Sequence, residues 1–168
     1  MGFLKRLFGT QAPEPAAPVL PEPGNAARTI RYDETLVDSL KHDHEELVAM
    51  YTRMGEDAAA GRFDGLDAAL QEFKVRLESH LLTENVRFYV YLEQMLADDA
   101  ENTALIRGFR REMNSIARGV VDFVARYRKE PVNAANQAEF LAAHGEVGRL
   151  LTQRIAREES ELYVLYHL

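Results

Sequence analysis

His80 and Glu84 are the residues of this chain whose types and spacing most clearly suggest chemistry. They lie four positions apart in the segment 73–95, FKVRLESHLLTENVRFYVYLEQM. Residues at positions i and i+4 of a helix lie on the same face, so these two side chains could hold a common metal ion or a common proton. A buried histidine hydrogen-bonded to a glutamate is the simpler interpretation. It is favoured for the pair taken alone, because buried polar side chains ordinarily find partners.

The helical face that carries this pair is otherwise apolar. With a period of 3.6 residues, one stripe contains Phe73, Leu77, His80, Leu81, Glu84, Phe88, Tyr91 and Met95. We therefore expect His80 and Glu84 to point into a protein core.

Two helices are predicted in the first half of the folded region, which begins near Tyr32. The first has core spacing at Val37, Leu40, His44, Leu47, Val48 and Tyr51. It is expected to end before Gly55, with a loop over residues 58–63. The second is expected to start near Asp64 or Gly65 and to run to about residue 97, so that it carries His80 and Glu84.

Two further helices are predicted in the second half. The third, with Asn102 as its N-cap and an end before Pro131, has a stripe of Ile106, Phe109, Met113, Ile116, Val120, Val124 and Tyr127. The fourth covers residues 135–166, with a stripe of Phe140, His144, Val147, Leu151, Arg154, Ile155, Glu158, Leu162 and Leu165. Short loops between four such helices predict an all-α, antiparallel up-down four-helix bundle over residues 32–168.

An internal repeat indicates which residues share a layer of this bundle. A shift of 74 positions places SHLLTENVRFYVYL on QRIAREESELYVLY, so that Tyr89 matches Tyr163, and a shift of 69 positions aligns the first helix with the third. The positions expected to converge at mid-bundle are His44, His80, Glu84, Met113, Arg154 and Glu158. His144 matches an apolar position in this alignment, Leu70, and we expect it to be a core or cavity histidine.

Composition limits the classes of function. The 168 residues are 46% apolar and 28% charged, which is typical of one soluble globular domain. A net charge of -7 argues against nucleic acid as the main partner. The absence of cysteine excludes disulfides, thiolate metal sites and iron–sulfur clusters. No apolar run approaches the roughly 20 residues of a membrane span, and no secretory signal is recognised, so a cytoplasmic location is expected.

Residues 1–31 are predicted to form a flexible leader before the bundle. Residues 11–24, QAPEPAAPVLPEPG, hold five of the six prolines and are typical of an extended linker. Residues 1–10, MGFLKRLFGT, are compatible with a short amphipathic turn that touches a membrane surface or a partner. A disordered tail is favoured because the segment is too short to form a stable helix in water.

These residues together resemble a known family. Three features are similar to the hemerythrin-like, or HHE, cation-binding domain. They are a histidine on the first helix (His44), the motif H-x-x-x-E at residues 80–84, and E-E at residues 158–159 followed by L-Y. The resemblance covers about residues 35–166. It implies a helical bundle that holds a non-haem di-iron centre.

The family pattern places a histidine on each of the first and third helices and H-x-x-x-E on each of the second and fourth. This chain matches the pattern at His44, His80, Glu84 and Glu158. Met113 stands where the resemblance implies the third-helix histidine, and Arg154 where it implies the fourth-helix histidine. A complete di-iron centre and oxygen carriage are therefore not expected.

The fourth helix also resembles the regulator of sigma D family, whose helical bundles bind the primary sigma factor of bacterial RNA polymerase. The matching positions are Asn136, Glu139, Phe140, Val147, Gly148, Leu151, Arg154, Glu158 and Glu159. Residues 44–48, HEELV, with Tyr51 and Gly55, are similar to the first helix of that family. This second resemblance implies a regulator that binds a protein without a metal.

Chemistry leaves two main alternatives for the central layer. Two imidazoles and two carboxylates suit one divalent ion such as iron, zinc or manganese. Arg154 cannot lose its proton, so it must either turn away from an ion or replace it. In the second case Arg154 would pair with Glu84 and Glu158, with His44 and His80 as hydrogen-bond partners. We place this metal-free network slightly ahead of a one-ion site, and both well ahead of a di-iron centre.

We interpret the chain as a hemerythrin-like protein with a degenerate metal site at His44, His80, Glu84 and Glu158. It is expected to be a non-enzymatic binding or sensing module related to iron, oxygen or redox state. At most one iron or other divalent ion is its expected cofactor. The alternative is a metal-independent regulator of the sigma D type, with a sigma factor as its protein partner.

Overall fold

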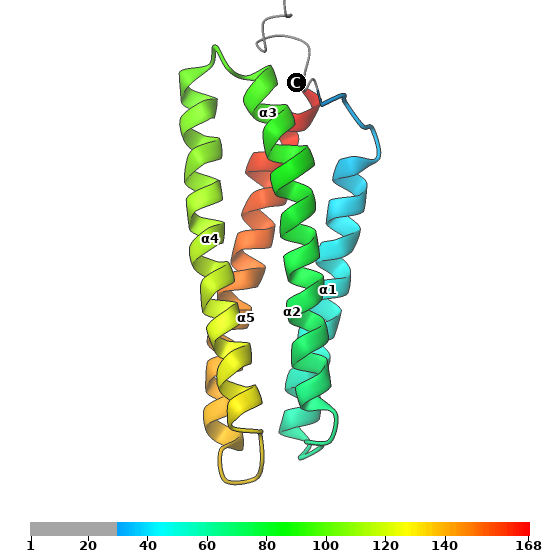
Figure 1. The fold of residues 1–168 in the computed structure, drawn as a ribbon, viewed down its shortest axis with the longest axis vertical. Helices are drawn as coiled ribbons and strands as arrows, with labels where there is room; N and C mark the ends of the chain where they lie inside the picture. Colours follow the sequence, from blue (N-terminus) through cyan, green and yellow to red (C-terminus); the bar gives the residue numbers. More distant parts are fainter. Residues whose placement is uncertain (1–29) are drawn as a thin grey trace, which may run out of the picture.

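The computed structural model describes residues 30–168, which form a four-helix bundle (Figure 1). Its long helices are α1 (Leu36–Ala59), α2 (Leu66–Thr83), α4 (Ala100–Lys129) and α5 (Gln137–Arg157). Shorter elements follow α2 and α5: the π-helical turn η1 (Glu84–Phe88) with helix α3 (Tyr89–Met95), and the π-helical turn η2 (Glu158–Leu162) with the 3₁₀ turn η3 (Tyr163–His167). The prediction of an all-α bundle is confirmed for these residues, which contain no strand.

The helices alternate in direction around the bundle. Helix α1 contacts α2 and α5, while α4 contacts the same two helices from the opposite side. The α1–α2 and α4–α5 loops lie at one end, and the C-terminus lies at the other (Figure 1). Each half of the sequence repeat therefore supplies one antiparallel helix pair, and the predicted layer lies where the two pairs face each other.

The two π-helical turns begin at the repeat-related residues Glu84 and Glu158. A π turn adds a residue to the helix and rotates the residues that follow it by about 100°. Tyr89 and Tyr163 consequently face the core. The same rotation turns Met95 outward, where it is 58% exposed, so its prediction as a core residue was wrong.

Helix α1 continues through Gly55 to Ala59, whereas the sequence predicted an end before this glycine. A Cβ atom at Gly55 would lie 2.6 Å from Cε1 of His144, and one at Gly148 would lie 2.8 Å from Cε1 of Tyr51. Both glycines therefore make room for ring side chains where α1 packs on α5. Gly55 is a packing residue rather than a helix terminator.

The start of α4 also differs from its prediction. Asp99 is the N-cap, and its side chain accepts a hydrogen bond from the backbone N–H of Asn102, the residue predicted to be the cap. The helix ends at Lys129, as the proline at position 131 requires.

Buried polar residues divide the core into two apolar clusters. One cluster extends toward the interhelical loops and includes Leu47, Phe73, Val124 and Phe140. The other lies toward the chain termini and includes residues Leu40, Phe88, Phe109 and Tyr166. The buried polar residues between them, which form the polar layer, are His44, His80, Glu84, Arg154 and Glu158.

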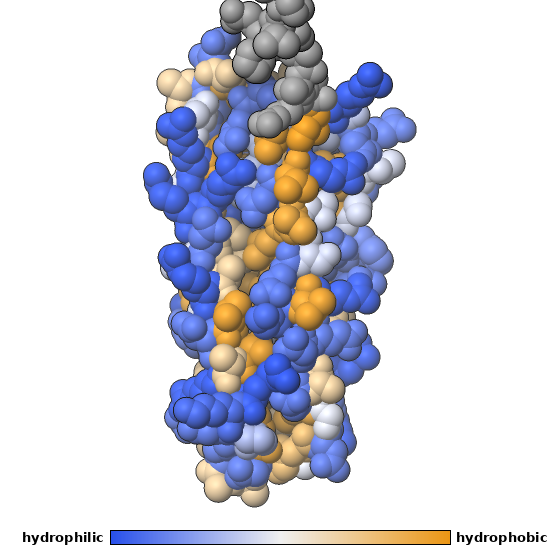
Figure 2. Space-filling view, in the orientation of Figure 1, coloured by the Kyte–Doolittle hydropathy of each residue, from blue (hydrophilic) through white to orange (hydrophobic). Residues whose placement is uncertain are grey.

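The surface over α2 and α3 carries a discontinuous apolar stripe (Figure 2). The large apolar side chains that are exposed along α2, η1 and α3 are Val75, Leu82, Val86 and Met95. Within residues 30–168, no helix combines the length and apolar character needed to cross a membrane. Nearly all of the predicted flexible leader, residues 1–29, lies outside the described residues.

Candidate metal centre

Four side chains from three of the bundle's four long helical segments converge in the polar layer. His44 comes from α1, His80 and Glu84 from the junction of α2 with η1, and Glu158 from the start of η2. One possible ligand atom from each lies within 4.8 Å of the other three. All four side chains are at least nine-tenths buried. The structure therefore brings together the four residues that the sequence singled out as metal ligands.

An outer carboxylate holds each imidazole. The Nδ1 atom of His44 lies 2.8 Å from Oε1 of Glu159, and Nδ1 of His80 lies 3.2 Å from Oδ2 of Asp43. Because a carboxylate accepts hydrogen bonds, both Nδ1 atoms carry the proton. Such outer partners fix the tautomer and orientation of metal-binding histidines.

The Nε2 atoms consequently face the buried carboxylates. Nε2 of His44 is 3.3 Å from Oε2 of Glu158, and Nε2 of His80 is 3.7 Å from Oε1 of Glu84. The second oxygen of Glu84, Oε2, is buried and has no hydrogen-bond partner. A buried carboxylate oxygen without a partner is costly, and a cation would satisfy it.

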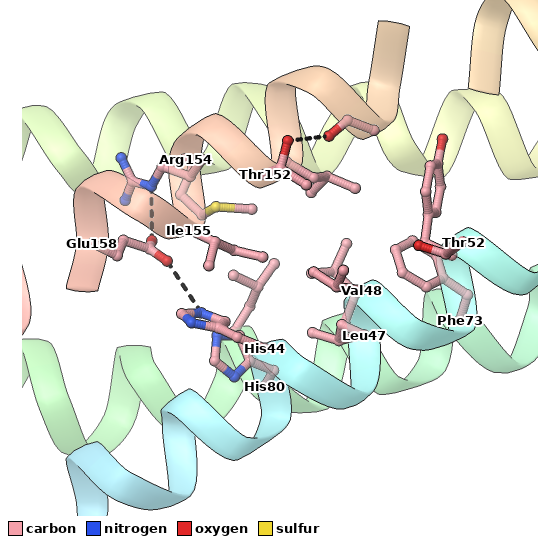
Figure 3. Close-up of a pocket in the computed structure, with 16 residues that line it drawn as sticks. His44, Leu47, Val48, Thr52, Phe73, His80, Thr152, Arg154, Ile155 and Glu158 are labelled. Atoms are coloured by element: carbon pink, nitrogen blue, oxygen red, sulfur yellow. Dashed lines mark hydrogen bonds and ion pairs between the residues drawn. The ribbon is translucent and has the colours of Figure 1, made fainter. Parts of the chain in front are cut away.

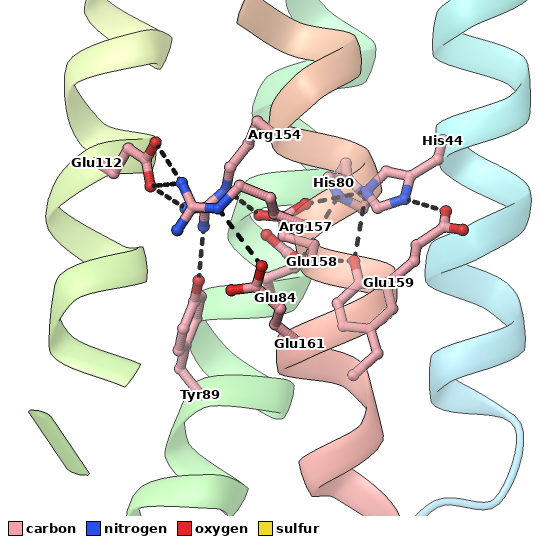
Figure 4. A network of polar contacts seen from close by, with 11 residues as sticks. His44, His80, Glu84, Tyr89, Glu112, Arg154, Arg157, Glu158, Glu159 and Glu161 are labelled. Atoms are coloured by element: carbon pink, nitrogen blue, oxygen red, sulfur yellow. Dashed lines mark hydrogen bonds and ion pairs between the residues drawn. The ribbon is translucent and has the colours of Figure 1, made fainter. Parts of the chain in front are cut away.

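Arg154 lies beside the cluster and is held away from the imidazoles (Figure 4). Its Nε donates to Oε1 of Glu158 at 2.7 Å, its Nη1 donates to Oε2 of Glu112 at 3.0 Å, and its Nη2 donates to the hydroxyl of Tyr89 at 3.3 Å. The guanidinium also packs 4.4 Å from the ring centre of Phe109. Arg154 therefore occupies the α4 side of the layer and leaves the four converging side chains on the other side.

Met113 reaches the same layer from α4. It lines a cavity of about 50 Å³ whose walls are mainly apolar and whose polar end holds His44, His80 and Glu158 (Figure 3). A thioether is a weak ligand for borderline ions such as ferrous iron or zinc. The cavity leaves room for a water molecule or another small ligand beside the cluster.

Tyr163 places a hydroxyl among the converging atoms. It donates to Oε1 of Glu84 at 2.7 Å and lies 3.3 Å from Nε2 of His44. Its ring stacks on His44 with an interplanar angle of 6°. Burial raises the pKa of Tyr163 far above its ordinary value, so without an ion the hydroxyl is protonated and donates.

The two buried glutamates have opposite pKa shifts. Burial, followed by the charge of Glu158, raises the pKa of Glu84 to about 8. Burial also acts to raise the pKa of Glu158, but its hydrogen bond with His44 and the charge of Arg154 outweigh that effect and lower it. Without a metal, Glu158 therefore carries the negative charge and Glu84 holds a proton near neutral pH.

The histidines also differ. Burial acts to lower the pKa of His44, but hydrogen bonds with Glu158 and Glu159 outweigh burial and raise it. Burial and the nearby charge of His44 lower the pKa of His80. An incoming cation must therefore displace protons from the layer, so we expect metal affinity to increase with pH.

The shift of Glu84 predicts a pH-dependent stability for the metal-free protein. Between its ordinary pKa of 4.5 and its folded pKa of about 8, the folded state binds more protons than the unfolded state. The free energy of unfolding should therefore fall as pH rises through this range, by at most about 1.4 kcal/mol per pH unit for one proton. Urea unfolding in a chelator at pH 5 to 8 would measure this slope. Glu84→Gln should remove most of this slope. If the free energy of unfolding falls equally with pH in the parent and the variant, the prediction is wrong.

The internal repeat could also have revealed supporting residues that the sequence interpretation missed. The shift of 69 positions that aligns the first and third helices places Asp43 on Glu112. Asp43 holds His80, and Glu112 holds Arg154, the repeat partner of His80. The sequence repeat thus carried a signal for Asp43 and Glu112.

His144 lies outside the cluster, as its position in the repeat predicted. Its Nε2 is 2.8 Å from the backbone carbonyl of Tyr51, whose hydroxyl donates to the backbone carbonyl of His144 at 2.8 Å. The two rings stack with centres 4.0 Å apart. This reciprocal pair joins α1 to α5 and is structural.

Comparison with known families agrees with this geometry. Residues 35–166 match the family described as the hemerythrin HHE cation binding domain. The chain belongs to the hemerythrin HHE cation-binding family. No match was found among curated proteins or solved structures.

The donor set of this hemerythrin-family protein fits one ion better than two. Two imidazoles and two carboxylates, one with an orphaned oxygen, provide four ligands for a single divalent cation. The family pattern implies two more histidines, at the positions of Met113 and Arg154. Neither a thioether nor a guanidinium replaces an imidazole as a ligand. Arg154 already neutralises Glu158 and would repel a second cation.

Proposed function

We propose that this protein binds one divalent cation, most consistently iron, and acts as a non-enzymatic binding or sensing module related to iron, oxygen or redox state. The single observation that carries the proposal is the convergence of His44, His80, Glu84 and Glu158, with each histidine held by an outer carboxylate. An iron ion bound there would supply a redox couple and a position for a small exogenous ligand.

The surroundings support binding rather than turnover. The cavity beside the cluster is small and mainly apolar, which suits a water molecule or a diatomic ligand better than a larger substrate. Arg154, which is paired with Glu158 and Glu112, would repel the second ion that two-metal chemistry needs. A cytoplasmic location remains a prediction.

The proposal predicts a stoichiometry of at most one iron per chain. Protein loaded with ferrous iron under anaerobic conditions and then desalted should retain close to one ion by elemental analysis. His80→Ala should lose most of it. His42→Ala is the matched control, because His42 lies on α1 with its side chain 68% exposed and should not affect retention. Two tightly held irons with an oxo-bridge absorption band would contradict a one-ion site.

A metal-independent regulator of the sigma D type is the second candidate function. It is favoured by one observation: Arg154 bonds Glu158, Glu112 and Tyr89, so the buried guanidinium is fully paired without an ion. Metal-free protein immobilised in a chelator should then capture a sigma factor from a bacterial lysate. Capture that requires added iron, or no capture, would favour the one-ion proposal.

A further inference from the structure

We infer that Tyr163 is a fifth ligand of the bound ion and that its phenolate oxygen adapts the site to ferric iron. This inference rests on the proposed one-ion site. The observation that carries it is the position of the hydroxyl, which lies within hydrogen-bonding distance of ligand atoms from both Glu84 and His44.

The spacing of the atoms is that of ligands sharing one ion. Two ligands each about 2.1 Å from an ion lie about 3.0 Å apart at right angles and about 3.4 Å apart at a tetrahedral angle. The Tyr163 hydroxyl is 2.7 Å from Oε1 of Glu84 and 3.3 Å from Nε2 of His44. Nε2 of His44 is in turn 3.3 Å from Oε2 of Glu158. Nε2 of His80 is 3.7 Å from Oε1 of Glu84. The hydroxyl therefore lies at least as close to two of the proposed ligand atoms as these atoms lie to each other.

The backbone explains why this tyrosine reaches the cluster. The π turn that begins at Glu158 rotates Tyr163 into the core, and the stacked ring of His44 supports its position. Tyr163 is 1% exposed. Its hydroxyl is therefore fixed by packing and does not depend on a mobile side chain.

Its repeat partner has a different environment. The hydroxyl of Tyr89 accepts a hydrogen bond from Nη2 of Arg154, on the α4 side of the layer. The hydroxyl of Tyr89 therefore has a guanidinium as its hydrogen-bond partner, whereas that of Tyr163 has a proposed ligand atom. The two tyrosines are related by the repeat and both are buried, but their hydroxyls have different hydrogen-bond partners.

Coordination exchanges one bond for another at the same oxygen. The O–H bond of Tyr163 breaks, the oxygen–iron bond forms, and the proton leaves to solvent. The iron keeps its oxidation state. Two imidazoles and three anionic oxygens then surround the ion, and hard anionic oxygen ligands favour ferric over ferrous iron.

The test uses full-length protein incubated with iron(III) nitrilotriacetate and then desalted. The parent should retain about one iron per chain and show a visible phenolate-to-iron charge-transfer band, with phenolate ring vibrations in the resonance Raman spectrum. Tyr163→Phe should lose the band and these vibrations. Tyr89→Phe is the matched control and should keep both.

Each outcome separates the inference from the proposed function. Iron held by the parent without a phenolate band, or a band that survives in Tyr163→Phe, would overturn the role of Tyr163 and leave the one-ion site intact. A parent that retains ferrous iron under anaerobic conditions but no ferric iron would also overturn only the role of Tyr163, whereas a parent that retains neither form would overturn both. Because the Raman measurement on the parent alone detects a coordinated tyrosine, the inference stays testable even if Tyr163→Phe fails to fold.

Discussion

Arg154→Ala is expected to destabilise the metal-free bundle by about 3–5 kcal/mol, the usual cost of removing one partner of a buried ion pair. The Arg154 side chain is 1% exposed, and its partner Glu158 is 2% exposed. After the substitution Glu158 keeps only His44 as a buried partner. Urea unfolding in a chelator at neutral pH would measure the loss.

Two further variants separate charge from packing. Arg154→Met fills most of the volume with an apolar side chain but still leaves Glu158 without its cation, so it should remain clearly less stable than the parent. Arg157→Ala removes another arginine that bonds Glu112, but the Arg157 side chain is 40% exposed. Its loss should cost about 1 kcal/mol or less, because solvent screens exposed pairs.

Added metal should reverse the effect of Arg154→Ala. Removing the guanidinium frees Oε1 of Glu158 and removes a positive charge that repels an incoming ion. Zinc affinity should therefore rise at least about tenfold over the parent, or about 1.4 kcal/mol. A metal at 100 times its dissociation constant stabilises the folded state by about 2.7 kcal/mol. Two outcomes would show that Arg154 does not control the charge of the layer. In one, Arg154→Ala is as stable as Arg157→Ala; in the other, zinc stabilises Arg154→Ala no more than it stabilises the parent.

The sequence predicted the bundle and its polar layer because both depend on local spacing. Apolar residues at a 3.6-residue period define the four helices, and histidines and glutamates interrupt that period at matching positions of the repeat. His44, for example, could be placed opposite His80 and Glu84 from the pattern alone. Antiparallel packing then brings these positions together with little freedom.

The π turns were not predictable in the same way. A π turn inserts one residue into a helix and is stabilised by the tertiary environment of the site rather than by local propensity. Continuing the 3.6-residue period through Glu84 therefore placed Met95 in the core, where Leu92 lies instead. The same insertion after Glu158 is what brings Tyr163 to the ligands, so its role was hidden from the sequence pattern.

The direction of the Arg154 side chain was also undetermined by sequence. Arginine at a buried position can turn toward or away from its neighbours, and the outcome depends on acceptors from other helices. Here Glu112 and Tyr89 lie on the α4 side and hold two of its nitrogens. Of the two alternatives considered for Arg154, the structure combines features of both. Arg154 pairs with Glu158, as in the metal-free network, but its other bonds go to Glu112 and Tyr89 rather than to Glu84, so its guanidinium lies on the α4 side of the cluster.

The double variant Met113→His with Arg154→His is expected to raise retained iron from about one to about two ions per chain. It places imidazoles at both positions where the family pattern implies them, giving four imidazoles and two carboxylates in one layer. Met113 is well placed for this change. It lines the cavity that contains His80 and Arg154, and also a second, smaller cavity that contains Glu84.

The single variants should be unequal, because charge repulsion in a buried layer outweighs one missing ligand. Arg154→His removes a fixed positive charge and adds a nitrogen, whereas Met113→His adds a nitrogen beside an unchanged guanidinium. We therefore expect Arg154→His to increase metal retention more than Met113→His. Ile116→His, about one turn along α4, is the control for a histidine added without a place in the layer. Elemental analysis after anaerobic ferrous loading gives the number of iron ions per chain. A double variant that still holds one ion would mean that the α4 side of this bundle cannot accept a second metal even when the histidines are restored.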